Sequence, residues 1–238
     1  MEGIVAYQQF FKRYELKYIL TDEQKNYILD AISPYMRLDG YGRTLIRNLY
    51  YDTDSFRLIR RSIEKPKYKE KLRLRAYGEP LQGERVFVEL KKKCDGVVYK
   101  RRIALTEDTA LSWLGGADAP MNGQIFREIG YFRDYYAPLS PKVALSYERE
   151  AFYSEGNPDL RLTFDYRIFA RTGNLNLGAL GGEPILSEGY TLMEIKTSGG
   201  MPMWLVSALS RGMIYKSAFS KYGAAYKNLI FKGEYINA

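Results

Sequence analysis

The stretch Lys-Glu-Lys-Leu-Arg-Leu-Arg at residues 69–75 sets a pattern that recurs along the whole chain. Every second residue is cationic, and these residues are Lys69, Lys71, Arg73 and Arg75. The residues between them and after them are Glu70, Leu72, Leu74 and Ala76. A period of two predicts a β-strand with one cationic and one apolar face. Such a face can lie in bulk water or line a charged cavity, because alternation alone does not separate the two.

Five further stretches repeat this alternation, at residues 13–20, 85–93, 97–105, 160–169 and 191–197. In the last of them, Glu194 and Lys196 alternate with Met193 and Ile195. Six strands with one charged face each need a common explanation. Either all six charged faces meet bulk water, or they line one polar cavity while helices cover the apolar faces.

The chain is predicted to contain eight strands, mostly in hairpin-like succession. They are expected at residues 10–20, 44–52, 69–75, 85–93, 97–105, 142–152, 160–169 and 190–197. Helices are expected after Thr21, at 55–64, after Thr106, and at 124–136, 203–211 and 219–231. Eight closed strands leave room for side chains or one narrow ligand. We therefore predict an α+β fold in a single domain over residues 1–238, an eight-stranded antiparallel β-barrel with a charged interior and helices packed outside.

The composition limits the chemistry. The 238 residues include 36 Lys and Arg against 28 Asp and Glu, and the net charge of +8 favours a polyanionic partner. Positive and negative residues are interspersed, which indicates a structured cationic site rather than a basic tail. The chain has no histidine, which excludes Ser-His-Asp hydrolysis and His-ligated zinc. A metal would need oxygen ligands, as Mg²⁺, Mn²⁺ and Ca²⁺ do.

The sequence also indicates where the protein works. Cys94 is the only cysteine, so an internal disulfide is excluded and a cytoplasmic location is expected. The first residues do not resemble a signal peptide, and no apolar run reaches membrane-spanning length. We expect no membrane segment in this chain.

A lumen lined by arginine and lysine suits a phosphate chain, because guanidinium groups bind phosphate oxygens in pairs. A few carboxylates on the same faces suit a divalent metal that bridges phosphate oxygens, and these are Glu194, Glu89, Asp165 and Glu15. Phosphoryl transfer depends mainly on positioning and charge neutralisation, so it needs no histidine. The chain lacks the Gly-x-x-x-x-Gly-Lys-Ser/Thr loop of P-loop enzymes.

Several short motifs resemble those of the triphosphate tunnel, or CYTH-like, superfamily, and within it the VTC domain. They are Glu15-Leu16-Lys17, Asn48-Leu49-Tyr50-Tyr51-Asp52, Lys71-Leu72-Arg73-Leu74-Arg75, Phe87-Val88-Glu89-Leu90-Lys91, Tyr147-Glu148-Arg149, Leu192-Met193-Glu194-Ile195-Lys196 and Phe219-Ser220-Lys221-Tyr222. Their order covers about residues 10–231. The VTC domain is the catalytic module of the vacuolar transporter chaperone polyphosphate polymerase. The resemblance implies an eight-stranded tunnel that transfers the γ-phosphate of ATP to inorganic polyphosphate with Mn²⁺ or Mg²⁺.

The resemblance also implies roles for individual residues. It matches the phosphate-binding residues of the family to Lys17, Arg73, Arg75, Lys91, Lys100, Arg149, Arg161 and Lys221, and the metal-binding glutamate to Glu194. Together with the other charged residues of the same strand faces and of the C-terminal motif, this predicts three sets of site residues. The catalytic set is Lys17, Arg73, Arg75, Lys91, Arg149 and Arg161, the substrate-binding set is Lys71, Lys100, Arg102, Lys196, Lys216 and Lys221, and the metal set is Glu194, Glu89 and Asp165. Two departures stand out. Arg13 replaces the first glutamate of the Glu-x-Glu-x-Lys signature of hydrolytic relatives, which argues against a triphosphatase. Ala218 replaces a family lysine, and Lys216 is its nearest substitute.

Other functions remain compatible with the pattern. One is a triphosphate hydrolase on the same scaffold, and another is a non-catalytic module that binds polyphosphate or nucleotides. RNA binding by a basic sheet is disfavoured, because the chain lacks the aromatic stacking motif of RNA-recognition sheets. The sequence therefore predicts ATP and polyphosphate as partners, and no nucleic acid.

Overall fold

One antiparallel sheet organises the molecule. The computed structural model describes residues 14–78 and 84–231, and the long strands follow the order β1-β10-β8-β7-β3-β4-β5-β6. Short strands β2 (Arg37–Leu38) and β9 (Glu183–Pro184) pair with β7 and β8. The long strands are β1 (Tyr14–Thr21), β3 (Thr44–Asp52), β4 (Tyr68–Tyr77), β5 (Arg85–Cys94), β6 (Val97–Thr106), β7 (Ser140–Tyr153), β8 (Arg161–Arg171) and β10 (Tyr190–Thr197).

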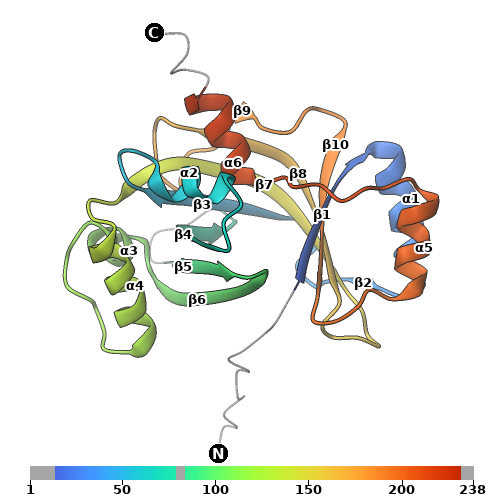
Figure 1. Cartoon of the computed structure of the whole chain (residues 1–238), viewed down its shortest axis with the longest axis horizontal. Helices are drawn as coiled ribbons and strands as arrows, with labels where there is room; N and C mark the ends of the chain where they lie inside the picture. The colour runs from blue at the N-terminus through green and yellow to red at the C-terminus, as the bar shows by residue number, and fades with distance from the viewer. Residues whose placement is uncertain (1–13, 79–83, 232–238) are drawn as a thin grey trace, which may run out of the picture.

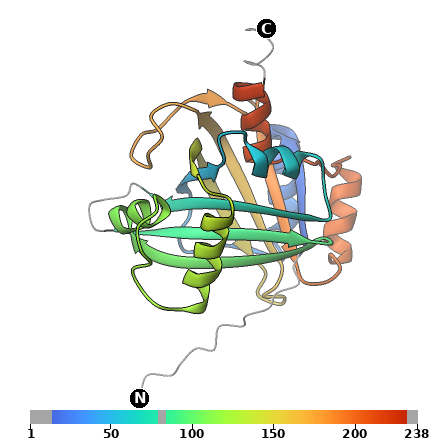
Figure 2. The same cartoon turned by 60° about the vertical axis from the view of Figure 1, so that its left-hand side comes forward.

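The sheet curls into a half-barrel, as Figures 1 and 2 show. Its two edges are β1 and β6, which do not pair with each other within the described ranges. The predicted eight-stranded antiparallel α+β fold is therefore confirmed, and one side of the curl is open between the edge strands. No helix in the described part of the chain is long and apolar enough to cross a membrane.

Four helices cover the convex face in two pairs. Helices α3 (Glu107–Leu114) and α4 (Gln124–Tyr135) pack on β4, β5 and β6, where Leu72, Leu74 and Val88 are buried. Helices α1 (Asp22–Ile32) and α5 (Met203–Arg211) pack on β1, β8 and β10. As expected, Thr21 caps α1, and Gln24 completes the capping box. The apolar half of each alternating strand thus finds its cover outside the curl.

Two helical segments instead close one end of the concave face (Figure 1). They are α2 (Arg57–Ile63) and α6 (Lys221–Ala225), which continues into a π-helical turn, η1 (Tyr226–Phe231). Tyr222 stacks on Tyr50 with ring centroids 4.7 Å apart. Buried Asp52 accepts hydrogen bonds from the Tyr222 hydroxyl and from two backbone N–H groups of α2. The charged interior predicted from the alternation therefore fills only part of the concave face, since this end is an apolar core.

Most element boundaries follow the sequence predictions to within a few residues, and one expected helix is divided. Residues 10–13 of the first expected strand and residues 79–83 of the expected turn lie outside the described residues. The helix expected at 219–231 divides into α6 and η1, because the backbone widens at Tyr226. The hairpin expected at Asp95 and Gly96 is confirmed, and both residues adopt positive φ angles, 45° and 87°.

Candidate phosphate-binding site

The first cluster of charges on the concave face surrounds Glu89 on β5. Strand pairing places Glu89 between Arg73 of β4 and Arg102 of β6. Its carboxylate is 1% exposed and lies 2.6 Å from an Arg73 nitrogen, 3.0 Å from Arg102 and 2.5 Å from Lys100. Arg75 approaches it to 3.7 Å. This Glu89 cluster thus holds four cations around one carboxylate, a surplus of positive charge that an anion would balance.

Three uncharged side chains hold the arginines of the Glu89 cluster in place. The Arg75 Nε donates to Asn48 Oδ1 at 2.9 Å, and another Arg75 nitrogen donates to the Tyr147 hydroxyl at 3.3 Å. Arg73 donates to the Tyr50 hydroxyl at 3.0 Å. Sequence reasoning quoted these residues only as parts of family motifs and assigned them no role in the site. Only the pairing of the strands could have indicated that these residues orient the arginines, since Asn48 and Tyr50 lie opposite Arg75 and Arg73 in the β3–β4 pair.

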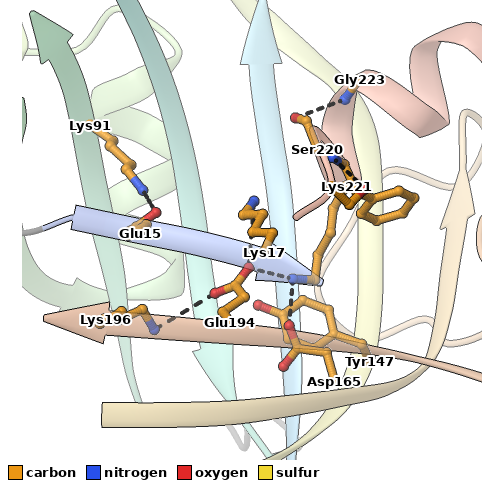
Figure 3. A network of polar contacts seen from close by, with 12 residues as sticks. Glu15, Lys17, Lys91, Tyr147, Asp165, Glu194, Lys196, Ser220, Lys221 and Gly223 are labelled. Carbon is orange, nitrogen blue, oxygen red and sulfur yellow. Dashed lines mark hydrogen bonds and ion pairs between the residues drawn. The ribbon is translucent and has the colours of Figure 1, made fainter. Parts of the chain in front are cut away.

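The second cluster is built on two carboxylates, Glu194 of β10 and Asp165 of β8 (Figure 3). Arg149 of β7 binds both oxygens of Asp165 at 2.5 and 2.7 Å and reaches Glu194 at 3.3 Å. Lys221, at the start of α6, contacts Asp165 and lies 3.1 Å from Glu194. Lys17 and Lys196 approach Glu194 at 3.5 and 3.7 Å. The Glu194 cluster therefore holds four cations around two carboxylates.

Burial and neighbouring charge oppose each other in the Glu194 cluster. Burial favours a neutral Glu194, but the charges of Lys221, Lys17 and Arg149 outweigh it and hold the pKa of this carboxyl well below its usual range. Burial also lowers the pKa of the Lys196 ammonium to about 8, with help from the charge of Arg149. Lys196 therefore loses its proton closer to neutral pH than an ordinary lysine does.

One ion pair joins the two halves of the curl near its open side. Lys91 Nζ on β5 lies 2.7 Å from Glu15 Oε2 on β1, although these strands are not neighbours in the sheet (Figure 3). Burial would raise the pKa of Glu15, but the charges of Lys91 and Lys196 lower it to about 2. Glu15 is therefore ionised, and its ion pair with Lys91 connects edge strand β1 to β5 in the other half of the sheet.

The structure brings most of the sequence-predicted residues onto one face but separates others. Lys71 lies beside the clusters and donates to the Ser220 hydroxyl at 3.0 Å. Arg161 begins β8 opposite Lys196 and is exposed, with no ion pair to a described residue. Lys216 is exposed, and its backbone bridges to Tyr18, so it joins neither cluster. Glu89 lies in a different cluster from Glu194 and Asp165, so the three predicted metal ligands are not brought together.

The carboxylates allow a test of the predicted metal. No group of three or more acidic or cysteine side chains suited to a metal occurs among the described residues. Glu194 and Asp165 share Lys221 and Arg149, so two hard oxygen donors lie close together. Mg²⁺ in phosphate sites uses one or two carboxylates and takes its other ligands from phosphate and water. These two residues fit such an ion, provided that some cations now bound to them shift onto phosphate oxygens.

The fold and its lining define a half-barrel protein with a strongly basic concave face. A VTC domain model matches residues 12–230, so the chain belongs to the VTC domain family. No curated protein matches it.

Solved structures support the fold. A proposed adenylate cyclase from Bacillus halodurans is 19% identical, with a TM-score of 0.52 over 88% of this chain and 95% of that one. A proposed adenylate cyclase from Vibrio parahaemolyticus is 14% identical, with a TM-score of 0.52 over 91% and 98%. A proposed adenylyl cyclase from Hippeastrum, described as having a dominant triphosphatase activity, is 18% identical, with a TM-score of 0.51 over 90% and 95%.

Proposed function

We propose that this protein is a polyphosphate polymerase that transfers the γ-phosphate of ATP to a growing polyphosphate chain, with Mn²⁺ or Mg²⁺, in the cytoplasm. The observation that carries the proposal is the charge balance of the concave face. The two clusters place eight cations around three carboxylates on the scaffold of a VTC domain. Such a face attracts a chain of phosphates, which carries negative charge on every unit.

In the proposed reaction, a terminal oxygen of the polyphosphate chain attacks the γ-phosphorus of ATP. A new P–O bond forms, the bond between the γ-phosphorus and the bridging oxygen breaks, and ADP leaves with that oxygen. Positioning and neutralisation supply most of the catalysis in such transfers. Arg73 and Arg75 are held by Tyr50 and Asn48, so their guanidinium groups are oriented before the phosphates bind.

Glu194 and Asp165 would hold the divalent metal. When bound, the ion would offset the charge that develops on the phosphate oxygens. Lys221 and Arg149 touch both carboxylates, so they are placed to move onto phosphate oxygens as the metal binds. Lys17 and Lys196 would neutralise the phosphates beside Glu194.

A second candidate is a triphosphate hydrolase, favoured by the triphosphatase activity described for the Hippeastrum protein. One observation counts against it here. Position 13, which lies outside the described residues, is arginine where hydrolytic relatives carry the first glutamate of their signature. Incubation with ATP and Mn²⁺ separates the candidates: a polymerase makes long chains, a hydrolase releases only orthophosphate, and a non-catalytic binding module does neither.

The decisive variant is Glu194→Gln, which keeps the shape of the side chain but removes its charge. We expect it to lose metal-dependent turnover and still bind tripolyphosphate in EDTA. Glu128→Gln is the matched control, because Glu128 also pairs with an arginine, Arg101 on the convex side, at 2.7 Å. Retained Mn²⁺-dependent activity in Glu194→Gln would contradict the metal assignment. Loss of metal-free binding as well would mean that Glu194 organises the cations instead.

A further inference from the structure

Two rows of lysines extend the concave face beyond the charge clusters. Strand pairing aligns Lys71 with Lys91, and one step further along the strands it aligns Lys69 with Lys93. All four side chains belong to the same face as Arg73 and Glu89, because side chains alternate along a strand. We call Lys69, Lys71 and Lys93, with exposed Lys65 beyond them, the lysine track.

The lysine track differs from the clusters because it lacks negative charge. Within residues 14–78 and 84–231, no carboxylate pairs with Lys65, Lys69, Lys71 or Lys93. Lys69 donates to the Ser62 carbonyl of α2 at 3.2 Å, and Lys71 donates to the Ser220 hydroxyl at 3.0 Å. Their ammonium groups are thus held by neutral oxygens alone, and two of their six N–H donors are used.

The positive charges of the lysine track repel one another. Burial, and after it the charges of Lys93, Lys17, Lys91 and Lys65, lower the pKa of Lys69. Burial and the charges of Lys17, Lys69 and Lys91 lower the pKa of Lys71 well below its usual range. Like charges held this close without a counterion are unfavourable, so an anion bound among them would be stabilised strongly.

The position of the lysine track indicates how that anion would be arranged. Its rows follow directly from the Glu89 cluster, and successive rows on one strand face are about 7 Å apart. The far row adjoins Lys65, which is exposed to solvent just after α2. A ligand in the clusters could therefore continue along β4 and β5 to solvent only if it carries negative charge along its length.

We propose that the lysine track binds the body of the polyphosphate chain, behind the reacting phosphates, and guides it from the Glu89 cluster to solvent past Lys65. This proposal rests on the proposed function and adds a binding segment to it. A single-stranded nucleic acid suits the track less well, because its rows carry no aromatic side chain on which a base could stack.

The test compares short and long ligands in a Lys69→Gln/Lys93→Gln double variant. We expect its affinity for long-chain polyphosphate to fall about tenfold or more, since each charged contact is strong. Its affinity for tripolyphosphate, which fills only the clusters, should change less than twofold. The slope of log affinity against log salt for the long chain should fall by about one per lysine, as it does for phosphate contacts elsewhere. Arg127→Gln/Arg211→Gln is the control, because both residues are exposed on α4 and α5, which cover the convex face.

Each outcome is informative. Equal losses for both ligands would place Lys69 and Lys93 in the reacting site and overturn the track. Unchanged affinity for the long chain would overturn it as well. Should the double variant fold poorly, Lys93→Gln alone serves, because the Lys93 side chain makes no hydrogen bond or ion pair to a described residue, and its backbone pairing in β5 is kept. If the wild-type protein makes no polyphosphate but binds long chains through these lysines, the proposed function is wrong. The proposal that the lysine track binds polyphosphate would then still hold.

Discussion

The two charge clusters both lie on the concave face, but they balance their buried cations and carboxylates in different ways. The Glu89 cluster has three arginines and one lysine around one carboxylate, whereas the Glu194 cluster has one arginine and three lysines around two carboxylates. Arginine offers a planar, permanently charged fork, and lysine offers a mobile charge that can titrate. In the function that we propose, the Glu89 cluster would hold phosphates in a fixed geometry. The Glu194 cluster would exchange some of its ion pairs for a metal.

The largest difference between the two clusters should appear in the free energy of unfolding when the central glutamate of each is replaced. Glu89 alone compensates four cations, whereas Glu194 shares its cations with Asp165. We expect Glu89→Gln to lower the free energy of unfolding by about 3–5 kcal/mol, because it leaves buried charges uncompensated. Glu194→Gln should cost clearly less. Chemical denaturation of both variants beside Glu128→Gln measures this, and an equal or larger loss in Glu194→Gln would reverse the comparison.

Bound polyanions should next reveal the surplus of positive charge. A ligand that binds only the folded state stabilises it by about 2.7 kcal/mol at one hundred times its dissociation constant. Thermal melts with tripolyphosphate should shift upward far more than melts with sulfate at matched ionic strength. Tripolyphosphate should raise the melting temperature of Glu89→Gln more than that of Glu194→Gln. The reason is that the Glu89 cluster then has no carboxylate left, whereas the Glu194 cluster still has Asp165. Equal shifts with tripolyphosphate and sulfate would indicate a merely basic surface.

Single arginines of the Glu89 cluster should then account for much of the affinity. Arg73→Ala and Arg75→Ala should each weaken tripolyphosphate binding by about 1.5–3 kcal/mol while the fold is retained. Arg75→Lys should recover only part of the loss, because lysine cannot keep the fork that Asn48 orients at 2.9 Å. Isothermal titration measures these values, with Arg101→Ala on the convex side as the control. Wild-type affinity in either alanine variant would show that its guanidinium does not touch the ligand.

The smallest effect concerns pH and belongs to the Glu194 cluster. The pKa of Lys196 is about 8 in the folded protein against 10.5 for an ordinary lysine. Between these values the unfolded chain binds more protons, so this group makes the free energy of unfolding rise with pH. From pH 7 to pH 9 wild type should gain on the order of 1 kcal/mol relative to Lys196→Met. Denaturation of both proteins at the two pH values tests this, and a constant difference would contradict the lowered pKa.

The sequence predicted individual strand faces better than it predicted partners. Arg73, Arg75 and Glu89 were placed on charged faces by alternation, which is a property of a single strand. The family motifs also predicted Glu194 and Lys221 as site residues, and the structure brings these two side chains to within 3.1 Å of each other. In contrast, Asn48 and Tyr147 received no role, because nothing in their own strands shows that they orient Arg75.

The sequence by itself determined the eight-stranded antiparallel fold, its cationic faces and the apolar faces that the helices cover, since a strand's period acts over neighbouring residues. Only the tertiary structure decided which cations contact which carboxylates, and so how the charged residues form two clusters. Strand register put four cations on Glu89, and the packing of Tyr222 against Tyr50 brought Lys221 of α6 to Asp165 and Glu194. The curl brought Lys91 to Glu15 across strands that never pair. These contacts join residues far apart in the chain, so they depend on long-range packing that local periodicity does not encode.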